Sequence, residues 1–143
     1  MPEIAKELQE KFVLYQFLNQ RLEEIKQHAT IIQHRMMEIE TSKIALTEMK
    51  TAKSESEILV PLGSGIYAFG RNSSSQKVLV DLGAGIIAKK TIDEATDFME
   101  KKKKEIEDAV QILQSEANAI TSKLQEIVPE LQQAAQEQQT AAG

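Results

Sequence analysis

Residues 59–68 read Leu-Val-Pro-Leu-Gly-Ser-Gly-Ile-Tyr-Ala, and residues 79–88 read Leu-Val-Asp-Leu-Gly-Ala-Gly-Ile-Ile-Ala. Seven of the ten aligned positions are identical, at an offset of twenty residues. Each copy has two apolar runs around a Gly-x-Gly break, and glycine readily adopts the positive φ angles of a tight strand connection. The motif occurs twice only, so it predicts a duplicated β hairpin and not a solenoid.

The segment before the repeat is predicted to be one long helix over residues 3–53, which contain no proline or glycine. Its apolar residues alternate in steps of three and four, as in one strand of a coiled coil. A helix of about 50 residues would be about 75 Å long at 1.5 Å per residue, so it would project from any small body. The seam consists of Leu8, Tyr15, Leu22, Ala29 and Met36 at one set of positions and Leu18, Ile25, Ile32 and Ile39 at the other.

A second helix is predicted over residues 91–138, after the hairpin segment 57–90. Thr91 and Glu94 have the spacing of a capping box, which favours a helix start. This helix has a matching seam, and we expect the two helices to form an intramolecular antiparallel coiled coil in which Ala29 meets Ala117. The second seam consists of Ile92, Met99, Ile106, Val110, Leu113, Ala117, Ile120, Leu124, Ile127 and Leu131.

Three polar features interrupt this pattern. Lys43 and Lys103 fall opposite each other in the seam, and we expect both to direct their ammonium groups outward. The lysine run 101–104 is flanked by acidic residues at helical pairing distances, which favours a solvated, ion-paired face over a nucleic-acid patch. Pro129 removes one amide donor, so a kink or break is expected there and fraying beyond Leu131.

Composition limits the function. The chain has 143 residues, a net charge of −5, no cysteine and two histidines. The negative charge weighs against nucleic acid or an anionic membrane as the main partner. No apolar run is long enough for a membrane span and no secretory pattern is visible, so we expect a cytoplasmic protein.

An enzymatic function is not expected. The Gly-x-Gly breaks lack the spacing and lysine of a P-loop. His28 and His34 lie about 240° apart around a helix, so they cannot ligate one metal ion together. No nucleophile stands beside a base, and neither a metal nor a cofactor is predicted.

Two long helices joined by these two hairpins resemble the alpha-type subunit of prefoldin, in its archaeal form or as the fifth eukaryotic subunit. The motif Lys89-Lys90-Thr91-Ile92-Asp93-Glu94-Ala95 is similar to the family's entry into its C-terminal helix. The resemblance covers nearly the whole chain, residues 1–143, as a single subunit. It implies a hexamer of two alpha-type and four beta-type subunits on a double β-barrel platform. It also implies an ATP-independent cochaperone that holds non-native proteins at its coiled-coil tips and passes them to a group II chaperonin.

The residues themselves support a platform and a tip. Isolated hairpins are marginally stable, so their apolar side chains need partner strands. We therefore predict an oligomer interface formed by Leu59, Val60, Leu62, Ile66, Tyr67, Phe69, Val78, Val80, Leu82, Ile86 and Ile87. The free helix ends are the predicted client-binding tip, with Ile4, Leu8, Phe12, Ile127, Val128 and Leu131.

Two alternatives stay open on sequence grounds. Leu8 and Leu131 could simply close the end of the coil. The whole chain could instead be a structural coiled-coil scaffold, which self-assembles through its hairpins without holding clients.

Overall fold

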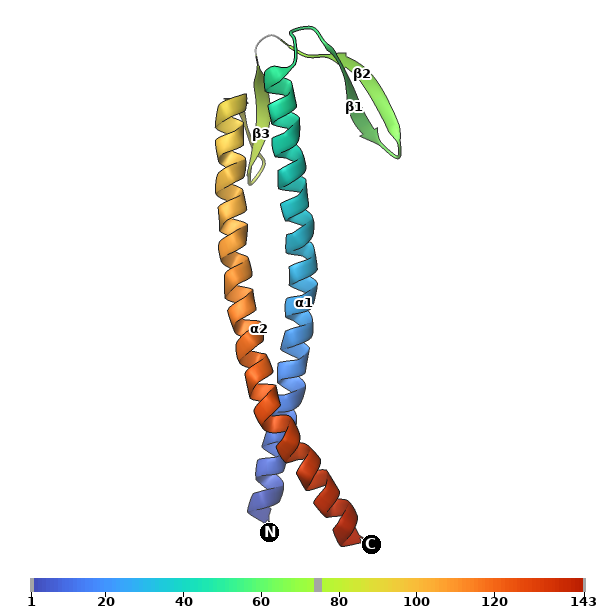
Figure 1. The fold of residues 1–143 in the computed structure, drawn as a ribbon, viewed down its shortest axis with the longest axis vertical. Coiled ribbons are helices and arrows are strands. Elements are labelled where there is room, and N and C mark those ends of the chain that lie inside the picture. Colours follow the sequence, from blue (N-terminus) through green and yellow to red (C-terminus); the bar gives the residue numbers. More distant parts are fainter. Residues whose placement is uncertain (1, 74–75, 143) are drawn as a thin grey trace. The chain divides into compact units, whose positions relative to one another are not determined.

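The computed structural model describes residues 2–73 and 76–142, with side chains described for residues 5–73 and 76–140. Helix α1 (Pro2–Thr51) is followed by strands β1 (Glu57–Gly63), β2 (Ile66–Arg71), β3 (Lys77–Gly83) and β4 (Ile86–Thr91), and then by helix α2 (Ile92–Ala142). Figure 1 shows the two helices and the hairpins that connect them in the chain. The predicted class, two long helices joined by two small β hairpins, is confirmed.

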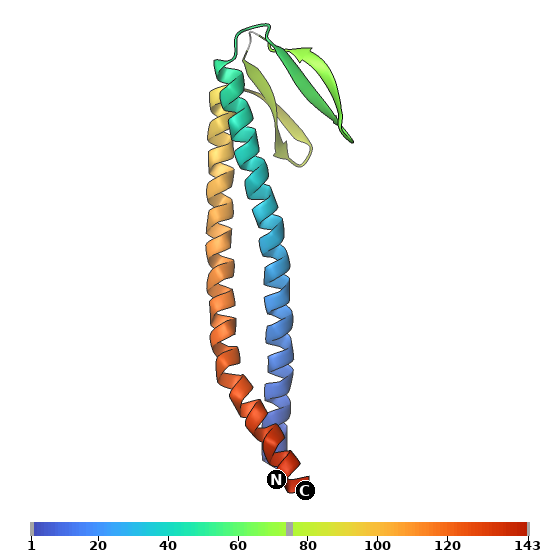
Figure 2. The same cartoon turned by 45° about the vertical axis from the view of Figure 1, so that its right-hand side comes forward.

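The chain divides into two compact units. One consists of residues 1–34 and 107–143, which are the N-terminal part of α1 and the C-terminal part of α2. The other consists of residues 35–106, which carry the remaining helical segments and both hairpins. Within each unit the two helical segments run antiparallel, as predicted (Figure 2).

Ion pairs between helices hold the coil in both units. In the first unit, Arg21 binds Glu116 through two hydrogen bonds of 2.6 and 3.0 Å. In the second, Lys50 of α1 lies 2.7 Å from Asp93 of α2. The buried apolar members of the seam include Ile25, Ile120 and Ile127 in the first unit and Ile39 in the second.

Only one of the two residues of the predicted Ala29–Ala117 layer lies inside the coil. Ala117 is half-buried, whereas Ala29 is exposed. Its small side chain therefore does little to fill the seam at that level.

The two seam lysines each meet a carboxylate of the opposite helix, which the sequence pattern did not predict. Lys43 pairs with Glu100, and Lys103 pairs with Glu40 at 2.9 Å. Both side chains are partly buried, because each reaches across to a carboxylate on the opposite helix. The pKa of Glu40 is held below its ordinary value, chiefly by its hydrogen bond with Lys103.

Of the kink or break predicted at Pro129, the break is absent, because α2 is helical through Ala142. Pro129 and Gln125 are both exposed. The carbonyl that loses its amide donor can therefore bind water, which lets the helix continue past the proline.

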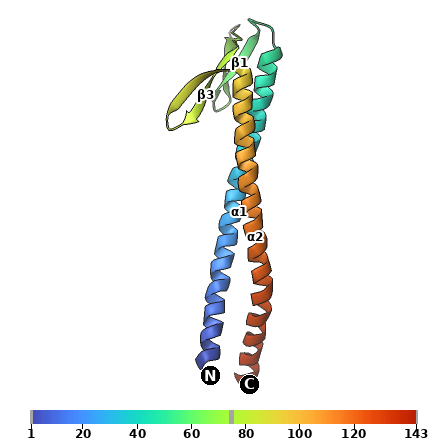
Figure 3. The same ribbon diagram turned by 90° about the vertical axis from the view of Figure 1, so that its left-hand side faces the viewer.

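Each hairpin is a separate two-stranded sheet (Figure 3). In the first, Leu59 pairs with Phe69 and Val60 with Ala68; in the second, the corresponding pairs lie twenty residues later. The predicted turn glycines have positive φ angles, and so do the residues between them, Ser64 and Ala84, each at 52°. Pro61 is the last residue paired before the bulge that precedes the turn, where a missing amide is tolerated.

The helix start is capped as predicted, because the Glu94 amide donates to the Thr91 hydroxyl at 3.1 Å. A small apolar core lies beside this cap. It consists of the buried residues Leu46, Val80, Ile92 and Ala95, with Met49, Val78, Phe98 and Met99 packed against them. The second hairpin is thereby fixed to both helices of its unit.

Candidate functional site

An apolar groove lies in the first unit, between the start of α1 and the end of α2. Its volume is about 450 Å³. It is formed where the two seams reach the free helix ends, and it has no charged side chain in its lining. The lining residues are Ala5, Leu8, Gln9, Phe12, Leu131, Ala134, Ala135 and Gln138.

The structure brings three of the six predicted tip residues into this groove, namely Leu8, Phe12 and Leu131. Phe12 is 50% exposed, and its ring stacks on Tyr15 at a centroid distance of 6.4 Å. A ring that is held in place yet half exposed offers apolar contact area at a small entropic cost. Leu8 and Leu131 are half-buried, so they both pack in the coil and border the groove.

The other predicted tip residues lie elsewhere. Ile127 is only 2% exposed and belongs to the closed seam. Val128 is half-buried and does not line the groove. The Ile4 side chain lies outside the described residues.

A charged groove of about 280 Å³ adjoins the apolar one and shares Leu8 and Ala134 with it. Lys11 and Glu130 form an ion pair of 2.5 Å in its lining. The hydrogen bond to Glu130 is the main reason why the pKa of Lys11 is raised. Lys11 therefore has a partner across the coil.

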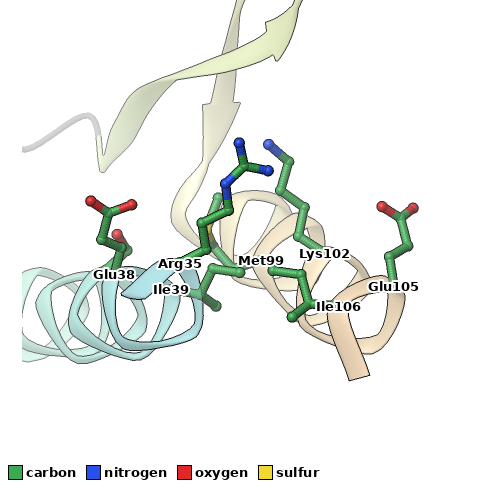
Figure 4. Close-up of a pocket in the computed structure, with 8 residues that line it drawn as sticks. Arg35, Glu38, Ile39, Met99, Lys102, Glu105 and Ile106 are labelled. Atoms are coloured by element: carbon green, nitrogen blue, oxygen red, sulfur yellow. The ribbon is translucent and has the colours of Figure 1, made fainter. Parts of the chain in front are cut away.

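A third hollow, of about 550 Å³, lies in the second unit (Figure 4). Ile39, Met99 and Ile106 form its apolar floor, and two cationic and two anionic side chains surround it. Because the charges balance, the rim favours no anion or cation. The charged residues are Arg35, Glu38, Lys102 and Glu105.

The lysine run 101–104 lies beside this hollow, and its side chains take different directions, with an ion pair among them to Glu40 of the other helix. Lys101 and Lys104 are exposed, whereas Lys102 lies 4.9 Å from the centre of the Phe98 ring and Lys103 pairs with Glu40. These lysines do not form a common basic patch.

The hairpins expose most of their apolar side chains. Phe69 is 80% exposed, and Leu62, Ile66 and Ile87 are all more than 60% exposed. Val80 differs, because it is only 7% exposed and packs in the core between hairpin and helices. The remaining predicted interface residues, Leu59, Val60, Tyr67, Leu82 and Ile86, are exposed, and Val78 is half-buried.

Some exposed apolar residues were not predicted. Leu79 is 72% exposed, and the repeat itself could have indicated it, because it stands at the place of Leu59. Val13 and Phe17 are 61% and 63% exposed on the outer side of α1. The sequence contains a signal for these two residues. The segment 12–18 has more apolar residues than the two seam positions per heptad of a coiled coil require.

Among the described residues, no three His, Asp or Glu side chains gather as a metal site. None of the described helices is both long and apolar enough to cross a membrane. The surface features described for these residues are thus an apolar groove, hollows with charged linings and apolar hairpin faces.

An antiparallel pair of long helices connected by two exposed apolar β hairpins defines a class of proteins, the coiled-coil proteins with a hairpin connection. Residues 18–137 match the family described as prefoldin subunit, and the chain belongs to that family. Prefoldins are chaperones, and the chain is a molecular cochaperone subunit.

Its relatives include prefoldin alpha subunits of archaea. That of Pyrococcus horikoshii is 28% identical over 139 residues, covering 96% of this chain and 94% of the relative. That of Thermofilum pendens is 29% identical over 113 residues, covering 79% and 88%. Prefoldin subunit alpha 1 of Thermococcus kodakarensis is 30% identical over 105 residues, covering 73% and 72%.

Two solved structures share the fold. The filamentous prefoldin from Methanocaldococcus jannaschii, solved by cryo-EM, has a TM-score of 0.72 and 20% identity, covering 82% of this chain and 97% of that one. The prefoldin beta subunit from Thermococcus strain KS-1 has a TM-score of 0.56 and 18% identity, covering 90% and 91%.

Proposed function

We propose that this chain holds non-native proteins at the free ends of its two helices and delivers them to a group II chaperonin. The observation that carries the proposal is the apolar groove that contains Leu8, Phe12 and Leu131. Non-native proteins expose apolar side chains, and an uncharged groove of small and medium apolar residues can bind many such segments without selecting one sequence.

The working form is proposed to be a hetero-oligomer of two copies of this chain and four beta-type subunits. Support comes from the hairpins, whose exposed side chains include Leu59, Tyr67 and Phe69. A two-stranded hairpin with such a surface is stable only when partner strands cover it. Several weak tips on one platform would then gain affinity through their effective concentration.

No reaction and no nucleotide are part of this proposal. The glycines of the repeat lie in strand turns instead of a phosphate loop. We propose that client holding is independent of ATP and that it takes place in the cytoplasm.

A test needs the assembled complex. We would co-express the chain with a beta-type subunit, replace Leu8, Phe12 and Leu131 together by serine, and measure suppression of client aggregation. The expected result is a marked loss of suppression with an unchanged oligomer mass in native mass spectrometry. The matched control is Ile112→Ser, which alters an exposed apolar residue of α2 away from the groove.

The scaffold alternative predicts a different outcome. Under that alternative the chain assembles by itself, and neither the assembly nor the triple serine variant affects client aggregation. Full suppression by the triple variant in an intact hexamer would also contradict binding at the tip.

A further inference from the structure

The charged groove beside the apolar one has an anionic lining. It carries three carboxylates, those of Glu7, Glu130 and Glu137, and one ammonium group, that of Lys11. The ammonium nitrogen lies 2.5 Å from a carboxylate oxygen of Glu130, so this pair is neutral as a unit. Glu7 and Glu137 are both exposed, and their carboxylates leave a net charge of −2 in the lining.

The surroundings of Lys11 agree with this charge. Its pKa is raised, first by the hydrogen bond with Glu130 and further by the charges of Glu7 and Glu126. An ammonium group whose charged form is stabilised by carboxylates of both helices lies in a negative potential. A second cation would therefore be attracted to this groove, although the lining already contains Lys11.

The last part of α2 is anionic in its sequence as well. Residues 124–143 contain three glutamates and no aspartate, lysine or arginine, so their net charge is −3. The net charge of the whole chain is −5. More than half of it therefore belongs to the segment that lines both grooves from the side of α2, and an anionic client segment would be repelled there.

The two grooves are continuous, because Leu8 and Ala134 line both of them. An apolar side chain in one groove and a cationic side chain in the other can thus come from one short segment. Lysine and arginine have apolar stems, which can pack along an apolar wall while the charged head reaches a carboxylate. Leu8 and Ala134, both half-buried, form such a wall between the two grooves.

We propose that the apolar groove prefers non-native segments that carry an apolar and a cationic side chain on the same side. The apolar side chain lies in the apolar groove beside Phe12, and the cation lies in the charged groove beside Glu7 and Glu137. The inference rests on the proposed function and names the class of client segment that this site binds best. The preference is several-fold and depends on salt, because exposed carboxylates are screened by it.

Photocrosslinking to the assembled complex tests this preference. Two peptides would be compared, one with Leu-Ser-Lys-Ser repeats and one with Leu-Ser-Glu-Ser repeats, because residues two apart share one side of an extended segment. In each peptide, one leucine is replaced by the photoreactive benzoylphenylalanine. The complex is made by co-expression with a beta-type subunit, and crosslinks to this chain alone are quantified by mass spectrometry. At low salt we expect the lysine peptide to label this chain several-fold more than the glutamate peptide does.

The double variant Glu7→Gln, Glu137→Gln should bring the two peptides toward equal labelling, and high salt should do the same in the natural complex. The matched control is Glu23→Gln, Glu107→Gln. It removes the same charge from exposed positions outside both grooves and should keep the natural ratio. Equal labelling by the two peptides in the natural complex, or an unchanged ratio in the groove variant, would overturn the inference.

The proposed function can fail separately in the same experiment. If the variant with serine at Leu8, Phe12 and Leu131 is labelled as strongly as the natural complex, the apolar groove is not the client site. That outcome contradicts both the proposed function and this inference. If instead both peptides label the natural complex equally and the serine variant loses this labelling, the groove binds clients and only the preference for cations is contradicted.

Discussion

The ammonium nitrogen of Lys11 lies 2.5 Å from a carboxylate oxygen of Glu130, the residue that follows Pro129. This ion pair joins the first turns of α1 to the part of α2 beyond the proline. Leu8 lies one turn away and lines both the apolar groove and the charged one. We therefore expect this contact to limit how far the helix ends separate and how much of the groove they expose.

Glu130→Gln is expected to increase binding of an apolar fluorescent dye by the assembled complex at low salt, because it removes the charge that holds Lys11. In the natural protein, added salt should raise dye binding toward the level of the variant, since salt screens an exposed pair. Glu23→Gln is the control, because Glu23 is an exposed carboxylate of α1 far along the helix from Lys11. Equal dye binding and equal salt dependence in all three proteins would contradict this role.

The stability of the coil should fall in acid through Glu116. Its pKa is lowered from the ordinary value of 4.5, first by the hydrogen bond with Arg21. A carboxyl group with a depressed folded-state pKa stabilises the fold fully above its unfolded value and loses this contribution as the pH falls through the folded value. Melting temperatures of the natural chain should therefore decline below about pH 4.5, and Glu116→Gln should decline less steeply. Identical pH profiles would show that the pair contributes nothing.

Val80 and Val60 should respond differently to the same truncation. Val80→Ala removes buried apolar atoms from the core between hairpin and helices and is expected to destabilise the isolated chain by about 2 kcal/mol. Val60→Ala alters an exposed residue and is expected to change stability by less than about 0.5 kcal/mol. Urea unfolding followed by circular dichroism measures both. Similar losses would mean that the first hairpin is also packed within the chain.

In the turn of the second hairpin, position 85 should require glycine, whereas position 84 should accept either alanine or glycine. Gly85 has a φ of 76°, so Gly85→Ala is expected to destabilise the chain by about 1 kcal/mol. Ala84 already occupies the left-handed region at 52°, and Ala84→Gly should stabilise the chain by less than about 1 kcal/mol, because glycine also loses more entropy on folding. Thermal unfolding gives the sign of each change, and a stabilising Gly85→Ala would contradict the turn geometry.

Periodicity predicted the elements because it reports which side chains can be buried together. The heptad seam indicated both helices, and the repeated Gly-x-Gly break indicated both hairpins. The same logic failed for Lys43 and Lys103, because a seam pattern describes which side a residue faces and not which carboxylate its long side chain can reach. It also failed for Val80. Val80 and Val60 occupy the same place in the two copies of the repeat. Only the second hairpin leads directly into α2, and this connection decides which of the two valines is covered.

The tip was predicted in part. Leu8, Phe12 and Leu131 belong to one groove because the seams of both helices converge at their free ends. Ile127 lies within the same stretch of sequence but one turn deeper in the coil, where it is buried. The exposed fraction of a side chain near a helix end changes within a single turn. The sequence pattern does not show at which turn the two helices stop packing against each other.

The ion pairs Lys43–Glu100 and Glu40–Lys103 differ in how strongly each depends on the alignment of α2 along α1. If α2 slid by seven residues in either direction, Lys43 would meet Asp93 or Glu107 and still find a carboxylate. Glu40 would instead meet Thr96 or Val110 and lose the cation of the opposite helix, keeping only Lys43 of its own helix at 3.9 Å. Lys43 therefore tolerates a misaligned coil, whereas Glu40 penalises one. A single carboxylate thus makes the correct alignment the favoured one in this part of the coil, and the core that fixes the second hairpin to the helices depends on that alignment.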